Sequence, residues 1–461
     1  MSPASTDWTS TRHRRSVTWI VALATAALAF DGYDLVVYGT ILPILMTDPT
    51  QLGAVSAAQA GALGSYALIG VMLGALLAGA FGDRIGRRKL TLISIAWFSV
   101  GMAAAAMTHT TATFGAMRLL TGIGLGGLIA TAGTVVAEFA PPSKKNMYNA
   151  IVYCGVPFGG VVASLVALLL RDAIGWRGLF WVGALPLVIL LPLVVWRLPE
   201  SPRWLVARGR IGEAHAITAS TGIPSPAAEE LAAERVGVQK VGFAALATRR
   251  YALGTILLGL MSFGGIMLTY GLNTWLPKIM ENAGFDAKNS LAFLLVLNGG
   301  AIVGGMLASW LADRTGPQRV IVATFGLAVL SLVVLTFQLP LWVLLGAVAA
   351  AGVGGIGTQI LIYGFVANYY STTARAAGVA WCAGFGRLGG IFGPIVGGLI
   401  LGAGLSSSIA LYIFAGIALL GAVLTVLVPA RRDAALGASP AQSAAGANLD
   451  TPAERTYIHH Q

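Results

Sequence analysis

The segment Gly82-Asp83-Arg84-Ile85-Gly86-Arg87-Arg88-Lys89 is a short basic loop between two long apolar runs. A weaker copy, Asp313-Arg314-Thr315-Gly316, follows 230 residues later, and the same shift places Gly159-Gly160 on Gly389-Gly390. Motifs that recur at one offset indicate an internal duplication. We therefore expect two similar helical halves, with a site at the interface between them.

Apolar residues dominate the remaining sequence. Hydrophobic residues make up 56% of the 461 residues and charged residues only 10%, which is far from the composition of soluble globular domains. A helix needs about 20 residues to span the ~30 Å hydrocarbon core. Twelve runs reach that order, at approximately 17–46, 58–81, 89–108, 112–138, 146–170, 176–196, 251–277, 289–312, 319–338, 340–367, 375–401 and 406–428. The expected fold class is an all-α membrane protein, with twelve transmembrane helices in two pseudo-symmetric six-helix bundles.

The polar stretches predict how the chain is divided. We expect an N-terminal segment, a first bundle, a linker, a second bundle and a disordered tail, at residues 1–16, 17–196, 197–250, 251–428 and 429–461. Of the 29 Lys and Arg, 23 lie on the side of both termini, four on the opposite side and two within apolar runs. The positive-inside rule then places both termini in the cytoplasm of a multi-pass cell-membrane protein.

Charge and residue usage exclude several other classes. The net charge of +11 is spread over short loops rather than over one basic face, so no nucleic-acid partner is expected. Cys154 and Cys382 lie in apolar runs and the five histidines outside them, which predicts neither a disulfide framework nor a metal site. No cofactor is implied. We find no constellation of nucleophile, base and metal, so an enzyme is not expected.

Small and aromatic residues are placed as in membrane helices. Spaced glycine pairs let such helices approach closely, and they occur at Gly70 and Gly74, Gly300 and Gly304, and Gly389 and Gly393. Tryptophans near helix ends are expected to form the interfacial belt; these are Trp19, Trp176, Trp196, Trp275 and Trp342.

Two aspartates, Asp31 and Asp34, fall inside the first apolar run. A carboxylate in a spanning helix costs several kcal/mol unless it faces a cavity or a partner, so such acids are functional candidates. Three residues apart, the two share a helix face, and their repulsion favours protonation of one of them. The alternative is a shorter first helix that leaves both acids in a loop.

Two arginines also lie within apolar runs. Arg387 is near mid-bilayer and needs an anion, either an aspartate of the protein or a substrate carboxylate held bidentately. The alternative is a permanent ion pair that joins the halves. Arg118 is nearer the end of its helix, and its side chain could snorkel outward. Uncharged polar residues in apolar runs are candidate substrate ligands or simple interhelical hydrogen bonds; these are Tyr38, Asn273, Asn298, Gln359 and Tyr363.

Several motifs carry a family resemblance over approximately residues 16–428. The loop at residues 82–89 resembles the signature loop of the major facilitator superfamily. Two further segments are similar to motifs of that superfamily, Arg118-Leu119-Leu120-Thr121-Gly122 and Pro199-Glu200-Ser201-Pro202-Arg203-Trp204. Three others resemble motifs of its aromatic acid:proton symporter family, namely Asp31-Gly32-Tyr33-Asp34, Thr274-Trp275-Leu276-Pro277 and Gly386-Arg387-Leu388-Gly389-Gly390.

The resemblance implies proton-coupled uptake of a small aromatic carboxylate, of the benzoate or hydroxybenzoate type, by alternating access. It implies proton coupling by Asp31, Asp34 and Arg118, with Arg387 and the five uncharged residues at the substrate. Asp83, Arg87 and Glu138 would form a cytoplasmic gate, with Asp313 as a weaker second gate, because Pro317 and Gln318 replace the basic residues there.

The partners would be the acid, protons and the lipid bilayer, and the protein is expected to be a monomer. A symporter of another organic acid or of a sugar-like metabolite, a drug or metabolite:proton antiporter, and a transporter-like sensor remain as alternatives.

Overall fold

The computed structural model describes residues 10–141, 144–223, 244, 246–249, 251–370 and 372–429, and every regular element in them is a helix. The first half comprises α1 (Thr11–Thr47), α2 (Pro49–Leu52), α3 (Ala57–Ile85), α4 (Arg87–Ala106), α5 (Thr111–Phe139), α6 (Lys145–Tyr153), α7 (Gly155–Gly183), η2 (Leu185–Leu187) and α8 (Leu190–Arg197). Two linker helices follow, α9 (Pro202–Ala207) and α10 (Ile211–Thr221). The second half comprises α13 (Ala252–Asn282), α14 (Ala287–Thr315), α15 (Pro317–Val334), α16 (Leu341–Gly352), η3 (Val353–Gly357), α17 (Thr358–Tyr369), α18 (Thr372–Gly402) and α19 (Ser407–Leu427).

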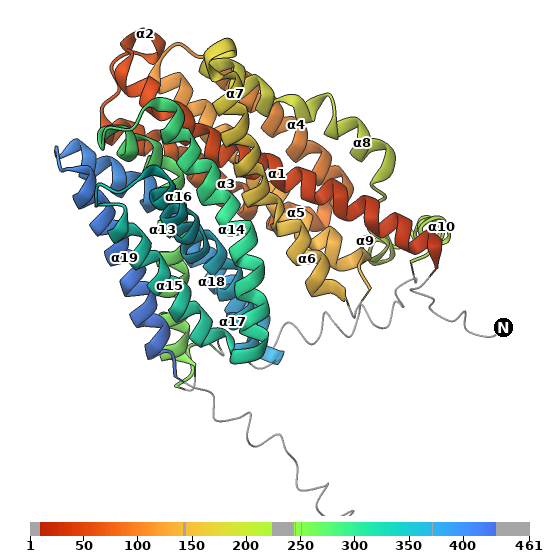
Figure 1. Ribbon diagram of the computed structural model, residues 1–461. Helices are drawn as coiled ribbons and strands as arrows, with labels where there is room; N and C mark the ends of the chain where they lie inside the picture. The colour runs from red at the N-terminus through yellow and green to blue at the C-terminus, as the bar shows by residue number, and fades with distance from the viewer. Residues whose placement is uncertain are drawn as a thin grey trace, which may run out of the picture.

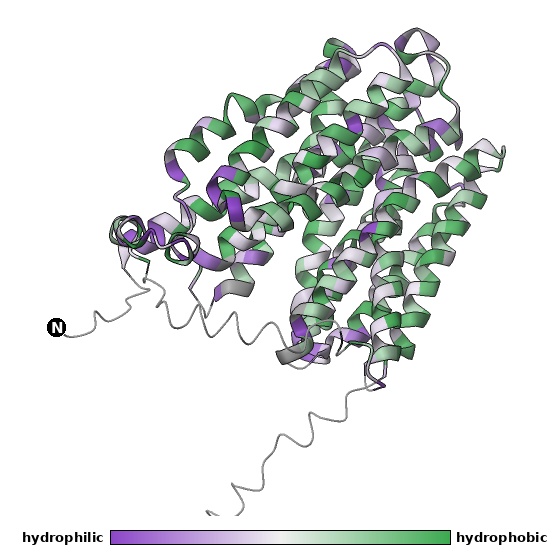
Figure 2. Ribbon diagram, turned by 180° about the vertical axis from the view of Figure 1, so that it is seen from behind, coloured by the Kyte–Doolittle hydropathy of each residue, from purple (hydrophilic) through white to green (hydrophobic). Residues whose placement is uncertain are grey.

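The two halves lie side by side as helical bundles (Figure 1), and hydrophobic residues cover most of the length of their helices (Figure 2). Eleven helical stretches of the described residues are long and apolar enough to cross a membrane, and a shorter apolar stretch, Leu185–Arg197, supplies the twelfth. This confirms the expected all-α fold with its twelve helices.

The sixth helix is broken, for reasons that the sequence explains. Gly175 takes a left-handed φ of 66°, which divides α7 into the fifth helix and the start of the sixth. Pro186 then stands in the short 3-10 turn η2, where its missing N–H would interrupt an α-helix. The run at 176–196 therefore becomes the end of α7, η2 and α8.

Spaced glycines bring helix backbones into contact, as expected. A Cβ added to Gly70 would lie 2.1 Å from the Leu119 carbonyl oxygen, and one on Gly74 would lie 2.0 Å from that of Ile123. In the second half, a Cβ on Gly300 would lie 2.3 Å from the Ala349 oxygen. No larger residue fits these crossings of α3 with α5 and of α14 with α16.

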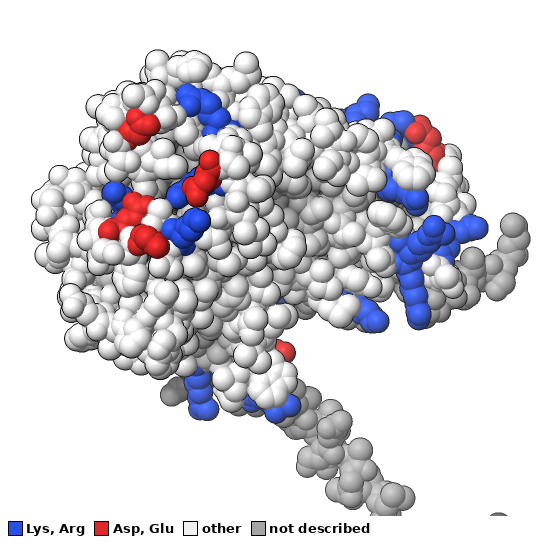
Figure 3. All heavy atoms as spheres, turned by 45° about the horizontal axis from the view of Figure 1, so that its top comes forward, with Lys and Arg blue, Asp and Glu red and all other residues white. Residues whose placement is uncertain are grey.

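The halves meet on what we call the far side, the end of the bundle where α1 ends and α3 begins; the opposite end is the termini side. The Ser65 hydroxyl of α3 donates to the Ile391 carbonyl of α18 at 2.6 Å. A Cβ on Gly61 would lie 2.6 Å from the Pro394 oxygen, and one on Gly398 would lie 2.6 Å from that of Ala57. Figure 3 turns the far side toward the viewer and shows a closed surface there, with the two lobes parting toward the lower edge.

Three details differ from expectation. Helix α1 begins at Thr11 rather than near residue 17, and it buries His13, which is 1% exposed. Trp275 and Trp176 are buried rather than interfacial, because their indole N–H groups donate to the Pro394 carbonyl and to Gln51 Oε1, both at 2.8 Å. The other three tryptophans are exposed, as a belt requires; they are Trp19, Trp196 and Trp342.

The glycine crossings predict a position-specific loss of stability. Gly74→Leu should lower the thermal unfolding midpoint strongly, because overpacking costs about 1–3 kcal/mol and here the obstacle is backbone. The matched control is Gly79→Leu on the same helix, where nothing lies within 4 Å of an added Cβ. Thermal unfolding of both detergent-purified variants measures the difference, and equal midpoints would contradict the prediction.

Candidate functional site

Helix α1 carries both aspartates at the centre of the bundle. It continues without a break from Thr11 to Thr47, so the alternative that both acids lie in a loop is wrong. Gly32 sets the rotation of the helix, because a Cβ there would lie 1.8 Å from the Val156 oxygen of α7. The neighbouring Tyr33 hydroxyl donates to the Leu179 carbonyl at 2.8 Å, on the same side.

Asp34 forms a buried ion pair with Arg118 of α5, and both side chains are 3% exposed. The Arg118 guanidinium also lies 5.1 Å from the centroid of the Tyr38 ring. The Tyr38 hydroxyl is engaged elsewhere, donating to the Ala60 carbonyl at 2.5 Å. Arg118 therefore points into the first half rather than snorkelling outward, and Tyr38 belongs to this pair.

Asp31 faces the other half of the molecule. It is 8% exposed and forms no hydrogen bond or ion pair with any described residue. Its main electrostatic partner is Arg387 of α18. Although three residues apart on one helix, the two acids are thus directed to different arginines.

Arg387 is half-buried and lies between residues of both halves. It has no carboxylate within 4 Å among the described residues, so a tight permanent ion pair is not what the structure holds. Its electrostatic neighbours are Tyr270 of α13, Tyr363 of α17, Tyr153 of α6 and Asp31. The result is an unpaired guanidinium among three tyrosines and one carboxylate.

A close helix crossing positions Arg387. A Cβ on Gly389 would lie 2.1 Å from the Phe263 oxygen of α13. Gly386 is also close to α13, since a Cβ there would lie 2.5 Å from Ser262 Oγ. The glycines on either side of Arg387 press α18 onto α13 and hold the guanidinium near Tyr270.

A small cavity of about 20 Å³ lies beside the aspartates, lined by both acids, Arg118, Tyr270 and Thr274 among others. That volume holds about one water molecule. The cavity joins the ion pair of the first half to α13 of the second half.

The remaining predicted ligands fall into two groups. Asn298 Nδ2 donates to Asn273 Oδ1 at 2.9 Å, and both side chains are buried. That pair links α14 to α13, which favours the interhelical hydrogen-bond alternative. Gln359 donates to the Ser262 hydroxyl at 3.2 Å, while its Oε1 is buried and receives no hydrogen bond from the described residues. Tyr363 lies near Arg387, and Gln359 precedes Tyr363 by four residues on α17.

Two tyrosines near Arg387, Tyr270 and Tyr153, were not predicted. Tyr270 lies inside the run 251–277, where its single hydroxyl was no stronger a signal than many others. The one signal in the sequence was its position four residues before Thr274, which places it on the same helix face as the start of the Thr-Trp-Leu-Pro motif. Tyr153 lies at the end of α6, one residue before the break that separates α6 from α7.

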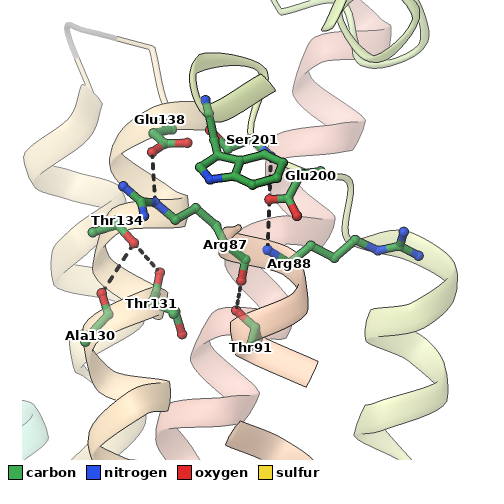
Figure 4. A network of polar contacts seen from close by, with 10 residues as sticks. Arg87, Arg88, Thr91, Ala130, Thr131, Thr134, Glu138, Glu200 and Ser201 are labelled. Carbon is green, nitrogen blue, oxygen red and sulfur yellow. Dashed lines mark hydrogen bonds and ion pairs between the residues drawn. The ribbon is translucent and has the colours of Figure 1, made fainter. Parts of the chain in front are cut away.

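Two of the predicted gate residues, Arg87 and Glu138, lie together at the termini side of the first half (Figure 4). Arg87 Nε is 3.6 Å from Glu138 Oε1. Glu200, part of the Pro199–Trp204 motif but assigned no role from the sequence, accepts the backbone N–H groups of Arg88 and Ser201, both at 3.0 Å. The Asp83 side chain falls outside the described part of the chain. Asp313 is exposed and has no ion pair or hydrogen bond with the residues described.

Known proteins resemble this chain over most of its length. The family model of the Major Facilitator Superfamily matches residues 24–338 and 299–456. The benzoate transport protein of Acinetobacter baylyi is 33% identical over 392 residues, covering 83% of each chain. The gentisate transporter of Corynebacterium glutamicum is 34% identical over 403 residues, covering 87% of this chain and 85% of its own.

Among solved structures, the xylose transporter of E. coli in a partially occluded inward-open conformation has a TM-score of 0.74 at 19% identity. The match covers 90% of this chain and 98% of that one. Three findings point to the same family. They are the twelve helices in two bundles, the charged residues at the interface of the bundles, and the match to the family model. The chain belongs to the Major Facilitator Superfamily and is a membrane transporter.

Proposed function

We propose that this transporter takes up a small aromatic carboxylate of the benzoate or hydroxybenzoate type, together with protons, by alternating access. The observation that carries the proposal is Arg387, a guanidinium at the interface of the halves that has tyrosine neighbours and no ion pair among the described residues. The relatives named as benzoate and gentisate transporters support the same substrate class.

The surroundings of Arg387 suit both parts of such a substrate. Its planar fork can hold a carboxylate through two parallel hydrogen bonds. Aromatic rings pack favourably edge-to-face or offset-stacked, which Tyr270 and Tyr363 can provide. The free Gln359 Oε1 could accept a hydrogen bond from a ring hydroxyl.

Proton coupling would follow from the separation of the two acids. Asp34 already neutralises Arg118, so it acts as a fixed counter-ion. Asp31 faces the same arginine as the substrate and competes with it. Protonation of Asp31 removes that competing charge and frees Arg387 to bind the anion.

Alternating access is supported by where the halves touch. The contacts through Ser65, Gly61 and Gly398 lie on the far side. The imbalance of 23 to four Lys and Arg supports a cell-membrane orientation with that side outside the cell and both termini in the cytoplasm. Arg87 and Glu138 would then act in the cytoplasmic gate.

Uptake into proteoliposomes tests the function directly. With an imposed pH gradient, acid outside, labelled benzoate or 4-hydroxybenzoate should enter faster than into protein-free liposomes, which report passive entry of the neutral acids, while acetate and xylose should show no protein-dependent uptake. Accumulation of xylose or of an aliphatic acid in place of the aromatic acids would indicate another symporter. Efflux against the proton gradient would indicate an antiporter, and binding without accumulation a sensor.

We expect substrate binding to require the guanidinium group of Arg387, and not only its positive charge. Arg387→Lys keeps the charge but loses the fork, so it should weaken substrate binding by about ten- to hundred-fold, as expected for losing a charge-assisted hydrogen bond. Arg387→Ala should weaken it further. The matched control, Arg375→Lys, changes an exposed arginine of the same helix and should leave affinity unchanged. Calorimetric titration measures all three, and wild-type affinity in both Arg387 variants would refute the carboxylate role.

Replacing Asp31 and replacing Asp34 should have different effects on transport and on stability. Asp31→Asn should abolish accumulation driven by a pH gradient while substrate exchange at equal pH persists, because binding no longer depends on protonation. Asp34→Asn leaves Arg118 buried without its anion, a change that typically costs 3–5 kcal/mol, so it should also lower the unfolding midpoint. Asp172→Asn, at a side chain 71% exposed, serves as the control. Full gradient-driven accumulation by Asp31→Asn would exclude that residue as the coupling site.

A further inference from the structure

A second pocket lies at the termini side of the first half, away from Arg387. Its volume is about 450 Å³, and it is bounded by the start of α4, the end of α8 and the linker helices α9 and α10. Its lining includes Arg88, Lys89, Trp196, Arg197 and Trp204. None of these residues belongs to the proposed substrate path.

The pocket carries excess positive charge. Four basic residues and two carboxylates, Glu200 and Glu213, line it. Glu213 is fully engaged, because Arg210 donates to both of its oxygens at 2.7 and 2.6 Å. Glu200 Oε1 accepts two backbone N–H groups. The other three basic residues form no ion pair within the described part of the chain; they are Arg88, Lys89 and Arg197.

Aromatic rings hold Arg197 in place. Its guanidinium lies 4.0 Å from the Trp196 ring centroid and 4.9 Å from that of Trp19. Its Nε is buried and makes no hydrogen bond with a described residue. Trp196 itself is 73% exposed. The pocket thus presents a positioned cation beside an exposed indole.

The pocket lies where the spanning helices end. Helix α4 begins at Arg87 and α8 ends at Arg197, which places the pocket at the level of the lipid headgroups. Helix α10 is joined to the start of α1 by a hydrogen bond from Arg12 Nη1 to the Ala219 carbonyl at 2.9 Å. The linker helices therefore lie beside the start of α1, at the termini side of the first bundle (Figure 1).

In the second half, two of these three basic positions are uncharged, and only Lys89 has a basic counterpart, Arg319. Arg88 Nη2 donates to the Val195 carbonyl at 2.5 Å, and Gln318, its counterpart 230 residues later, donates to the Thr425 carbonyl at 2.9 Å. A neutral amide therefore makes the same kind of contact to the last helix of its half as Arg88 does. The counterparts of Trp196 and Arg197 are the apolar Val426 and Leu427.

We propose that this pocket binds the phosphate of an anionic phospholipid from the leaflet on the termini side. Arg88, Lys89 and Arg197 would contact the phosphate, while Trp196 packs against the glycerol backbone and the first acyl carbons. The chemistry recognised is a phosphate whose negative charge is not cancelled by a cationic headgroup, as in phosphatidylglycerol but not in phosphatidylcholine. The exposed indole and the position at headgroup level favour a lipid over a soluble phosphate.

Native mass spectrometry of the full chain tests the lipid site. The protein is released from micelles that contain equal amounts of phosphatidylglycerol and phosphatidylcholine, and the lipid that stays bound is identified. The wild type should retain phosphatidylglycerol preferentially. Lys89→Gln combined with Arg197→Gln should reduce that preference roughly thirty-fold, from about five-fold per basic residue near a membrane. The matched control is Arg319→Gln, the counterpart of Lys89 in the second half and also exposed, and it should retain the wild-type preference.

Two further measurements distinguish a lipid site from a misfolded variant and from a site for soluble phosphate. Phosphatidylglycerol should raise the unfolding midpoint of the wild type and of Arg319→Gln but not of the double variant, whose midpoint in phosphatidylcholine alone should equal that of the wild type if it is folded. Millimolar inorganic phosphate should leave the lipid preference intact. Displacement of the lipid by phosphate, or equal preference in the double variant and the wild type, would overturn the proposal.

Discussion

A charge inside a bilayer must be paired or must face water, and this constraint explains where the polar groups of the transporter lie. Asp34 and Arg118 meet the constraint together, within one half and beneath the ring of Tyr38. Asp31 and Arg387 are left at the interface between halves, each with the other as its principal opposite charge. Of the two acids on α1, only Asp34 forms an ion pair with a described residue.

Much of this could be predicted from the sequence, because membrane helices leave a strong signal. The lengths of the apolar runs predicted the helices, and the motifs repeated after 230 residues predicted the duplication. Charge inside the apolar runs identified four candidate site residues, Asp31, Asp34, Arg118 and Arg387. The sequence could not assign each acid to its arginine. That depends on the rotation of α1, which is set by the contact of Gly32 with the α7 backbone.

Other features could not be predicted from the sequence because they depend on tertiary contacts. A tryptophan near a helix end reads as interfacial, yet the Pro394 carbonyl on α18 makes Trp275 a buried donor. Tyr153 and Tyr270 resemble any other tyrosine until both are found beside Arg387. Conversely, Asn273 and Asn298 stood out as polar residues in apolar runs, and the structure pairs them with each other.

The continuity of α1 has a mechanical consequence. The helix is unbroken from Thr11 to Asp34, and its only internal proline, Pro43, lies beyond both acids. Arg12 ties its inner end to α10, and the 19 residues from there to Asp31 amount to a rod of roughly 28 Å at 1.5 Å per residue. A tilt of five degrees at the linker end would displace the Asp31 carboxylate by roughly 2.5 Å, comparable to the difference between a direct contact and one bridged by water. A displacement at the linker end of α1 would therefore reach Asp31, which has no ion pair among the described residues, through one continuous helix.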